Sequence, residues 1–218
     1  MPSSAFTRVA YNGDLQIYFK EFLPRSPAEQ FKARLRGSRA DRARRNADSL
    51  NYAGFDAPRS VYWGNLPGGG EYLYSEAVPG KPVDTWLWGT AGNGDFPLRR
   101  ALLHDLGIFI GRLHATGFIH GDLRPGNLMA HRVEQRFRFW LLDNERNLRR
   151  IPAPGKMLLR NLMQLNMLPP VLLGPTDRMR FFRAWHSQMR DLDRVAAKVM
   201  AAASHDWAMR RMRTKGAL

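Results

Sequence analysis

The 218-residue sequence predicts an α+β fold that consists of two unequal lobes. Three observations support this prediction. The first third of the chain is rich in predicted strands with one main helix, and the remainder is mostly helical. A stretch rich in Gly and Pro separates these two parts. We therefore expect an N-terminal lobe over residues 1–78, a connection with little regular structure over 79–97 and a helical C-terminal lobe over 98–218. A cleft near residues 77–95 would suit a small ligand.

The first lobe is predicted to be an antiparallel sheet with one main helix. Residues 15–22 (LQIYFKEF) alternate and are rich in aromatic and branched side chains, which is typical of a strand. Asn12-Gly13, directly before them, is a favoured hairpin turn pair. The remaining elements expected in this lobe are a basic helical stretch over about 28–53 with a break near Gly37-Ser38, and a second hairpin formed by 61–63 and 71–76 around a Gly-rich turn.

The second lobe begins with the clearest helix in the chain, over residues 98–116. Its apolar residues recur at helical spacing, and Gly117 follows as a stop signal. Residues 137–142 (FRFWLL) are predicted to form a strand that ends at Asp143. From Lys156 onward the Leu-, Met- and Arg-rich sequence predicts further helices, with a basic end at residues 210–215.

The composition restricts the classes of function. The chain has no cysteine, which excludes disulfides and cysteine-based zinc sites. No run of about 18 apolar residues occurs, and the first 14 residues lack the pattern of a secretory signal, so neither a membrane span nor secretion is expected. The net charge of +15, from 34 Lys and Arg against 19 Asp and Glu, favours polyanionic partners: anionic lipid, a phosphorylated glycolipid or nucleic acid.

The octapeptide HGDLRPGN, residues 120–127, collects polar groups in one loop between a predicted helix and a predicted strand. Asp122 and Asn127 lie five positions apart, and Asp143 lies sixteen positions beyond Asn127. Protein kinases place a base, a metal-binding asparagine and a strand-end aspartate in this order, with a strand lysine upstream that Lys20 would supply. Ordinary turn chemistry also explains Gly and Pro in the loop, but not the aspartate that ends the following strand.

Phosphoryl transfer accounts for this choice of residue types. The phosphates of ATP need a cation and Mg²⁺, which prefers carboxylate and amide oxygens as ligands. The acceptor hydroxyl needs a nearby carboxylate to take its proton. The pattern therefore predicts a protein-kinase-like fold with ATP and Mg²⁺ as cofactors.

Four segments resemble the lipopolysaccharide kinase (Kdo/WaaP) family: HGDLRPGNLM with FWLLDNER, RNLMQLNMLP, TDRMRFFRAW and the strand IYFKEF. The resemblance covers roughly residues 15–190 and is strongest around the loop. It implies a small bacterial kinase that phosphorylates Kdo or heptose in the inner core of lipopolysaccharide at the cytoplasmic face of the inner membrane. It also implies Asp122 as the base, and Asn127 and Asp143 as metal ligands.

Further roles follow from the same resemblance. Lys20 would contact the phosphates, and His120 would be structural and would orient the loop. Tyr18, which shares a strand face with Lys20, and Glu76, at the end of the strand before the connection, complete the predicted nucleotide-binding residues. The other histidines are expected to be packing or surface residues: His104, His114, His131, His186 and His205.

The sequence departs from the kinase pattern in three places. No glutamate lies in phase on the first-lobe helix, so the carboxylate partner of Lys20 is unassigned. No Gly-x-Gly-x-x-Gly precedes Lys20, where only Asn12-Gly13 is available. Asp143 is followed by Asn144-Glu145 in place of Phe-Gly, which predicts no regulation by a moving phenylalanine.

These departures leave two alternatives to a lipopolysaccharide kinase. One is a catalytically weak, kinase-like regulatory protein that binds nucleotide. The other is a small atypical kinase associated with tRNA modification, which the basic residues 210–215 would suit. The basic stretch from Lys32 to Arg45 is interpreted either as a solvated helix face or as a contact with membrane phosphates, which would place the protein peripherally at the membrane.

Overall fold

The structure is a computed structural model with two compact units. Unit 1 comprises Met1–Val78 with Trp140–Arg146, and unit 2 comprises Pro79–Phe139 with Asn147–Leu218. The residues that the structure describes are 6–24, 37–67, 69–153 and 155–216. Three predicted features lie partly outside the described residues. These are the first part of the helical stretch predicted over 28–53, the start of the predicted basic stretch, and Gly68 of the predicted turn.

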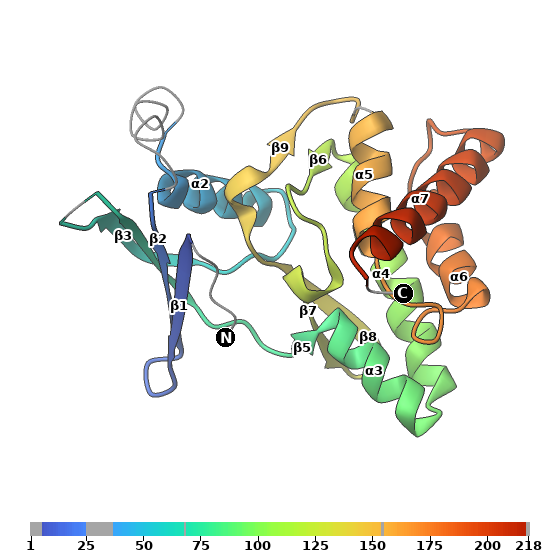
Figure 1. Cartoon of the computed structure of the whole chain (residues 1–218), viewed down its shortest axis with the longest axis horizontal. Helices are drawn as coiled ribbons and strands as arrows, with labels where there is room; N and C mark the ends of the chain where they lie inside the picture. The colour runs from blue at the N-terminus through green and yellow to red at the C-terminus, as the bar shows by residue number, and fades with distance from the viewer. Residues whose placement is uncertain (1–5, 25–36, 68, 154, 217–218) are drawn as a thin grey trace. The chain divides into compact units, whose positions relative to one another are not determined.

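Unit 1 contains a four-stranded antiparallel sheet in the order β1-β2-β4-β3 (Figure 1). β2 covers most of the strand predicted over 15–22 but begins at Ile17, because residues 13–16 form the turn that follows Asn12. Lys20 on β2 is paired with Val9 on β1 and Leu73 on β4. The strands are β1 (Thr7–Asn12), β2 (Ile17–Phe22), β3 (Ser60–Asn65) and β4 (Glu71–Glu76).

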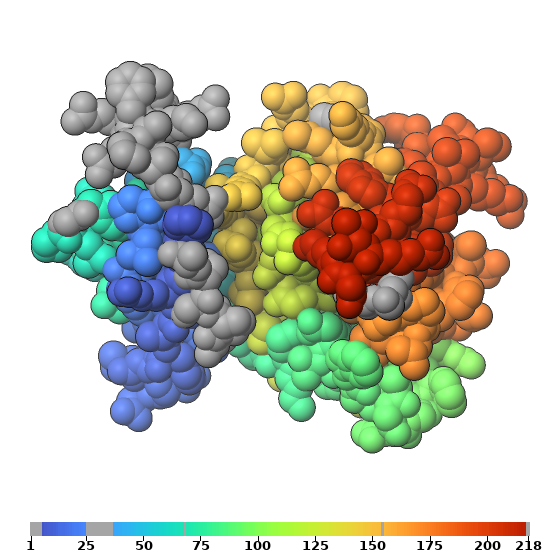
Figure 2. All heavy atoms as spheres, in the orientation of Figure 1, coloured from blue at the N-terminus to red at the C-terminus, as the bar shows by residue number. Residues whose placement is uncertain are grey.

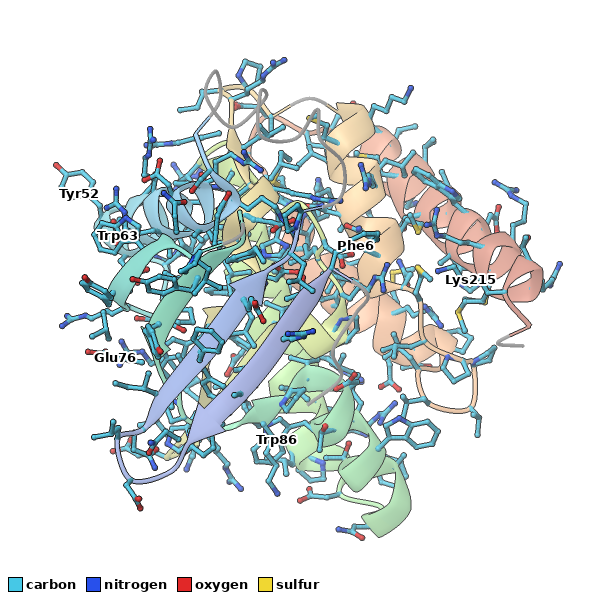
Figure 3. The ribbon with its side chains drawn as sticks, turned by 60° about the vertical axis from the view of Figure 1, so that its left-hand side comes forward. Phe6, Tyr52, Trp63, Glu76, Trp86 and Lys215 are labelled. Carbon is cyan, nitrogen blue, oxygen red and sulfur yellow. The ribbon has the colours of Figure 1, made fainter. Side chains whose placement is uncertain are left out.

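Helix α2 (Arg39–Tyr52) packs against this sheet. Ser38 caps its first turn by accepting a hydrogen bond from the Asp41 N–H, as expected from the predicted break at this point. Ala40 and Ala43 on one face form a buried cluster with Phe22 and Leu73 of the sheet. The last residue, Tyr52, is almost fully exposed (Figure 3).

The prediction of little regular structure over 79–97 is wrong. The segment forms a short strand, β5 (Lys81–Pro82), and a three-turn helix, α3 (Val83–Asn93). Val83, Leu87 and Thr90 recur at helical spacing and are buried. The glycines of this helix weaken its intrinsic propensity, and tertiary packing of its apolar face overrides that preference.

Helix α4 (Phe96–Ala115) confirms the helix predicted over 98–116. Gly117 follows it with a φ of 83°, the left-handed conformation that glycine adopts without steric cost. Gly107 and Gly111 allow α4 to approach α6 (Pro175–His186) closely, because a Cβ at either position would lie within 2.6 Å of an α6 carbonyl oxygen. This close approach makes α4 and α6 the main helix pair of unit 2.

The other elements of unit 2 surround this pair. The predicted strand before Asp143 is β8 (Arg136–Leu141), and a strand that the sequence did not predict, β7 (Leu128–Val133), lies between β5 and β8 in one sheet. The remaining elements are β6 (Phe118–Ile119) paired with β9 (Leu148–Arg149), the single turns η1 (Pro125–Asn127) and η2 (Asn144–Arg146, in unit 1), α5 (Gly155–Leu165) and α7 (Arg194–Thr214).

Helix α7 packs on α5 through a buried cluster of Met163, Ala208, Met209 and Met212. Its atoms, red in Figure 2, form part of the surface of unit 2. α7 continues to Thr214, so all but the last of the basic end at residues 210–215 is helical. In the described part of the chain, no helix has both the length and the apolar character that crossing a bilayer requires.

Candidate active site

The HGDLRPGN loop lies between β6 and β7 in unit 2. Pro125 starts the single turn η1, where its fixed φ suits the first helical position. Leu123 and Pro125 are buried and anchor the loop by their apolar side chains. The loop is therefore held by the packing of two residues that lie between Asp122 and Asn127.

The carboxylate of Asp122 is oriented by three side chains. Its Oδ1 accepts a hydrogen bond from Gln164 Nε2 at 3.0 Å and forms an ion pair with Arg124 Nε at 2.9 Å. Its Oδ2 lies 3.4 Å from Asn127 Nδ2. These contacts fix the side chain in place. Because it is 33% exposed, it is still accessible to a substrate hydroxyl.

His120 is buried beneath the loop. Its Nδ1 accepts a hydrogen bond from the Asp122 N–H at 3.1 Å, a contact that supports the orienting role predicted for this residue. Asn161 on α5 binds both backbone groups of His120: its Oδ1 accepts from the N–H at 3.0 Å and its Nδ2 donates to the C=O at 2.7 Å. Helix α5 thus fixes the start of the loop.

The side-chain amide of Asn127 is oriented by the backbone of Asp122. Its Nδ2 donates to the Asp122 backbone carbonyl at 2.8 Å, which determines the direction of the side-chain amide. The amide oxygen consequently points away from Asp122, and an amide oxygen is a ligand type that Mg²⁺ accepts. The residue present at this position therefore fits a hard divalent cation.

Lys20 and Asp143 meet in unit 1. Lys20 Nζ lies 2.6 Å from Asp143 Oδ1, and both side chains are partly exposed. Asp143 has a φ of 58°, a left-handed conformation that Asp tolerates better than most residues. The partner of Lys20, which the sequence left unassigned, is therefore the strand-end aspartate itself.

Helix α2 contacts the Asp143 segment without the glutamate of the kinase pattern. Arg39 at the start of α2 forms an ion pair with Glu145 at 3.1 Å, and both side chains are buried. Asn46, about two turns further along the same face of α2, donates to the Asn144 carbonyl at 2.7 Å. The residues that replace Phe-Gly after Asp143 are thus the ones that α2 binds.

The two other predicted nucleotide-binding residues lie on opposite faces of the sheet in unit 1. Tyr18 shares its face with Lys20, and its ring packs on that of Tyr11 with centroids 4.6 Å apart. Glu76 ends β4 with an exposed side chain on the other face (Figure 3). Contact of either residue with a nucleotide stays a prediction.

In the described part of the basic stretch, from Gly37 to Arg45, two of the four arginines pair with aspartates of their own helix. Arg44 contacts Asp41 and Asp48, and Arg45 pairs with Asp41. The guanidinium of Arg44 also lies over the Trp63 ring, 4.4 Å from its centroid. For these residues, the contacts favour the interpretation as a solvated helix face.

Sequence reasoning missed Arg124, Asn161 and Gln164. Arg124 is the second residue after Asp122 in the same loop, so its place in the motif could have indicated a contact with Asp122. Asn161 and Gln164 are polar residues three apart in a helix of Leu and Met, and both are buried. Buried polar groups interrupting an apolar helix face indicate hydrogen bonding to another element, but the sequence does not reveal which one.

Acid is expected to weaken the fold through His114, which is fully buried on α4. Burial lowers the pKa of His114 from 6.5 to about 4. Between these values the unfolded chain binds a proton that the folded chain does not, so stability falls as the pH drops from about 6.5 to 4, by about 3 kcal/mol in total. Urea midpoints at pH 7 and 4.5 measure this loss.

The loss should be smaller in His114→Gln, which has no titrating group, even though this variant is less stable at pH 7. His131→Gln is the matched control, because His131 is exposed. An equal loss of stability in the wild type and in His114→Gln would contradict the prediction.

A cavity of about 570 Å³ lies between α6 and α7 in unit 2. Apolar side chains and basic groups line it together: among them are Met179, Phe182, Ala201, Arg183, Arg194 and Lys198. It was not predicted from the sequence, because its walls come from two helices that are brought together only by folding.

Comparison with known proteins decides the family. The sequence model of the lipopolysaccharide kinase (Kdo/WaaP) family matches residues 3–185, a range that contains every predicted site residue. The chain belongs to this family. It is therefore a phosphotransferase that acts on a sugar hydroxyl, as predicted.

Two solved structures of kinases share the fold. WaaP in complex with acyl carrier protein has a TM-score of 0.65 at 17% identity, over 95% of this chain and 87% of that one. WbdD with the kinase inhibitor LY294002 has a TM-score of 0.53 at 20% identity, over 95% of this chain but only 44% of that one. The predicted α+β, kinase-like fold class is confirmed. A search of curated proteins finds no match.

Proposed function

We propose that this protein transfers the γ-phosphoryl group of ATP to a hydroxyl of Kdo or heptose in the inner core of lipopolysaccharide. The observation that carries the proposal is the fixed carboxylate of Asp122, with Asn127 five residues later bound to the same loop. The family match supports the sugar and the lipopolysaccharide.

Asp122 accepts the proton of the acceptor hydroxyl as that oxygen attacks the γ-phosphorus. A carboxylate in this role accelerates transfer typically by 10² to 10⁴. Arg124, beside Asp122, supplies positive charge that stabilises the phosphoryl oxygens as negative charge develops on them. Lys20 binds the phosphates of ATP through the positive charge of its ammonium group.

Asn127 and Asp143 would hold magnesium through their side-chain oxygens, and the bound ion would neutralise the phosphates. Lys20 and Asp143 form an ion pair within unit 1. The proposed phosphate-binding cation and the proposed metal ligand therefore hold each other in position before nucleotide binds.

Transfer of labelled phosphate from ATP tests the proposal directly. Two acceptors are compared, one glycolipid ending in Kdo and one that also carries heptose, both presented in vesicles of anionic lipid. Label on either sugar supports the kinase and identifies the acceptor. Nucleotide binding without label on any sugar would favour the regulatory alternative. Label transfer that requires tRNA would favour the small kinase associated with tRNA modification.

We place the protein peripherally at the cytoplasmic face of the inner membrane, because its acceptor is a lipid and its net charge is +15. The described part of α2 pairs most of its own charges, so the attraction is expected from the chain as a whole. Transfer should therefore be faster with acceptor in anionic vesicles than in neutral ones, and this difference should shrink at high salt.

The WaaP structure contains acyl carrier protein, and we extend this partner to the present chain as a proposal. The cavity between α6 and α7 supports it, because an apolar floor suits an acyl chain and a basic lining suits anionic groups. Mass spectrometry of the purified protein is expected to detect co-purified acyl carrier protein. Ala201→Trp, which narrows the cavity, should abolish that co-purification, whereas Ala203→Trp outside the lining should not.

A further inference from the structure

A chain of hydrogen bonds runs through the interior of unit 2 and ends at Asp122. Trp185 Nε1 on α6 is 3.0 Å from His114 Nδ1 on α4, and His114 Nε2 is 3.3 Å from Asn161 Oδ1 on α5. Asn161 Nδ2 is 3.2 Å from Gln164 Oε1, and Gln164 Nε2 is 3.0 Å from Asp122 Oδ1. The four side chains before Asp122 are all buried.

The chemistry of the first residue determines the direction of the first two bonds. An indole N–H can only donate, so His114 Nδ1 must accept from Trp185 and carries no proton. Burial lowers the pKa of His114 to about 4, so its ring is neutral at pH 7. The single ring proton is therefore on Nε2, which donates to Asn161.

Backbone groups determine the direction of the last two bonds. Asn161 is oriented by its two bonds to the His120 backbone, so its Nδ2 faces Gln164. Gln164 Oε1 accepts from both Asn161 Nδ2 and the Leu123 N–H, so its Nε2 must face Asp122. Every bond therefore donates toward the carboxylate, and bonds aligned in one direction polarise and strengthen one another.

We propose that Gln164 is a positioning residue for Asp122 and that Trp185, His114 and Asn161 fix its orientation. This inference rests on the proposed function, in which Asp122 is the base. Oδ1 is bound by Gln164 and Arg124, whereas among the residues that the structure describes the contact of Oδ2 is the long one with Asn127. The chain thus holds Oδ1 and leaves Oδ2 as the oxygen that takes the proton of the acceptor.

Steady-state kinetics of Gln164→Met and Gln164→Glu test the role of the last bond. Met has a similar length but cannot donate, and Glu places an acceptor against the carboxylate. Both variants should lower kcat about 10- to 100-fold and leave the KM for ATP within about twofold of the wild-type value, because a base out of position slows chemistry and not binding. Gln135→Met, in an exposed turn of the same unit, should leave both unchanged.

Trp185→Phe tests the chain at its far end, with a smaller change of shape. It removes the first donor and keeps an aromatic ring, so kcat should fall several-fold with an unchanged KM for ATP. Trp207→Phe on α7 is the matched control outside the chain. If Gln164→Met does not fold, Trp185→Phe decides, and an unchanged kcat there would overturn the inference.

Nitrogen-15 NMR of the histidine rings provides a readout that needs no activity. His114 should be the neutral Nε2–H tautomer at pH 7, and Trp185→Phe should alter its Nδ1 shift. A protonated Nδ1 in the wild type would overturn the inference. An inactive wild type with the expected NMR signature would reject the proposed function alone, and an active wild type with unaffected Gln164 variants would reject the inference alone.

Discussion

Replacement of Asp122 by asparagine is expected to reduce kcat for sugar phosphorylation by about 10² to 10⁴. The amide has nearly the same shape as the carboxylate, so the loop should keep its conformation. It cannot take a proton from the acceptor hydroxyl, however. Nucleotide binding depends on other residues, so the Kd for ATP, measured by calorimetry, should stay within about threefold of the wild-type value.

Asp191→Asn is the matched control, because Asp191 is an exposed aspartate of the same unit. It should leave kcat unchanged. A fully active Asp122→Asn protein would show that the loop does not supply the base, and a loss of ATP binding together with kcat would show that Asp122 acts on the nucleotide instead.

Replacement of Arg39 by methionine is expected to lower the free energy of unfolding by about 3–5 kcal/mol. Arg39 and Glu145 form an ion pair in which both side chains are less than a tenth exposed. Removal of the guanidinium takes away the buried cation that the Glu145 carboxylate contacts, while its contact with the exposed Arg146 remains. Arg39 also donates to the carbonyls of Phe6 and Leu23, so its loss removes further bonds.

Urea unfolding of the full chain measures this effect, with Arg8→Met as the matched control. Arg8 pairs with Glu21 in the same unit, but its side chain is 68% exposed, so the same substitution should cost less than about 1 kcal/mol. The double variant Arg39→Met, Glu145→Leu should recover part of the loss, because it removes the buried carboxylate together with its buried cation. Equal effects of Arg39→Met and Arg8→Met would contradict the prediction.

The Arg39 pair also has a consequence for the site. Glu145 lies two residues after Asp143, and Asn46 binds the intervening residue. Helix α2 therefore supports the position of Asp143 by binding the two residues that follow it, whereas in the kinase pattern this helix carries a glutamate that pairs with the strand lysine. Part of the Arg39→Met defect should accordingly appear as weaker binding of Mg²⁺ and ATP in the protein that remains folded.

Sequence alone was sufficient where the signal is local. The five-residue spacing of Asp122 and Asn127, the alternation around Lys20 and the apolar period of α4 each depend on neighbours along the chain. The structure contains all three elements, since hydrogen bonds and faces in a turn, a strand or a helix repeat at short intervals. The roles predicted for Asp122 and Asn127 stay predictions, which the kinetic experiments test.

Only the tertiary structure decided the pairings between distant residues. Lys20 meets Asp143 across 123 positions, Arg39 meets Glu145 across 106, and Gln164 meets Asp122 across 42. The helix over 83–93 likewise forms in spite of its glycines because its apolar face is buried. No local sequence pattern indicates which distant residue each of these groups contacts. For the buried groups, the partner is selected because burial removes water from a polar or apolar group and leaves one arrangement that satisfies it. Lys20 and Asp143 remain partly exposed, and the fold of unit 1 brings them together.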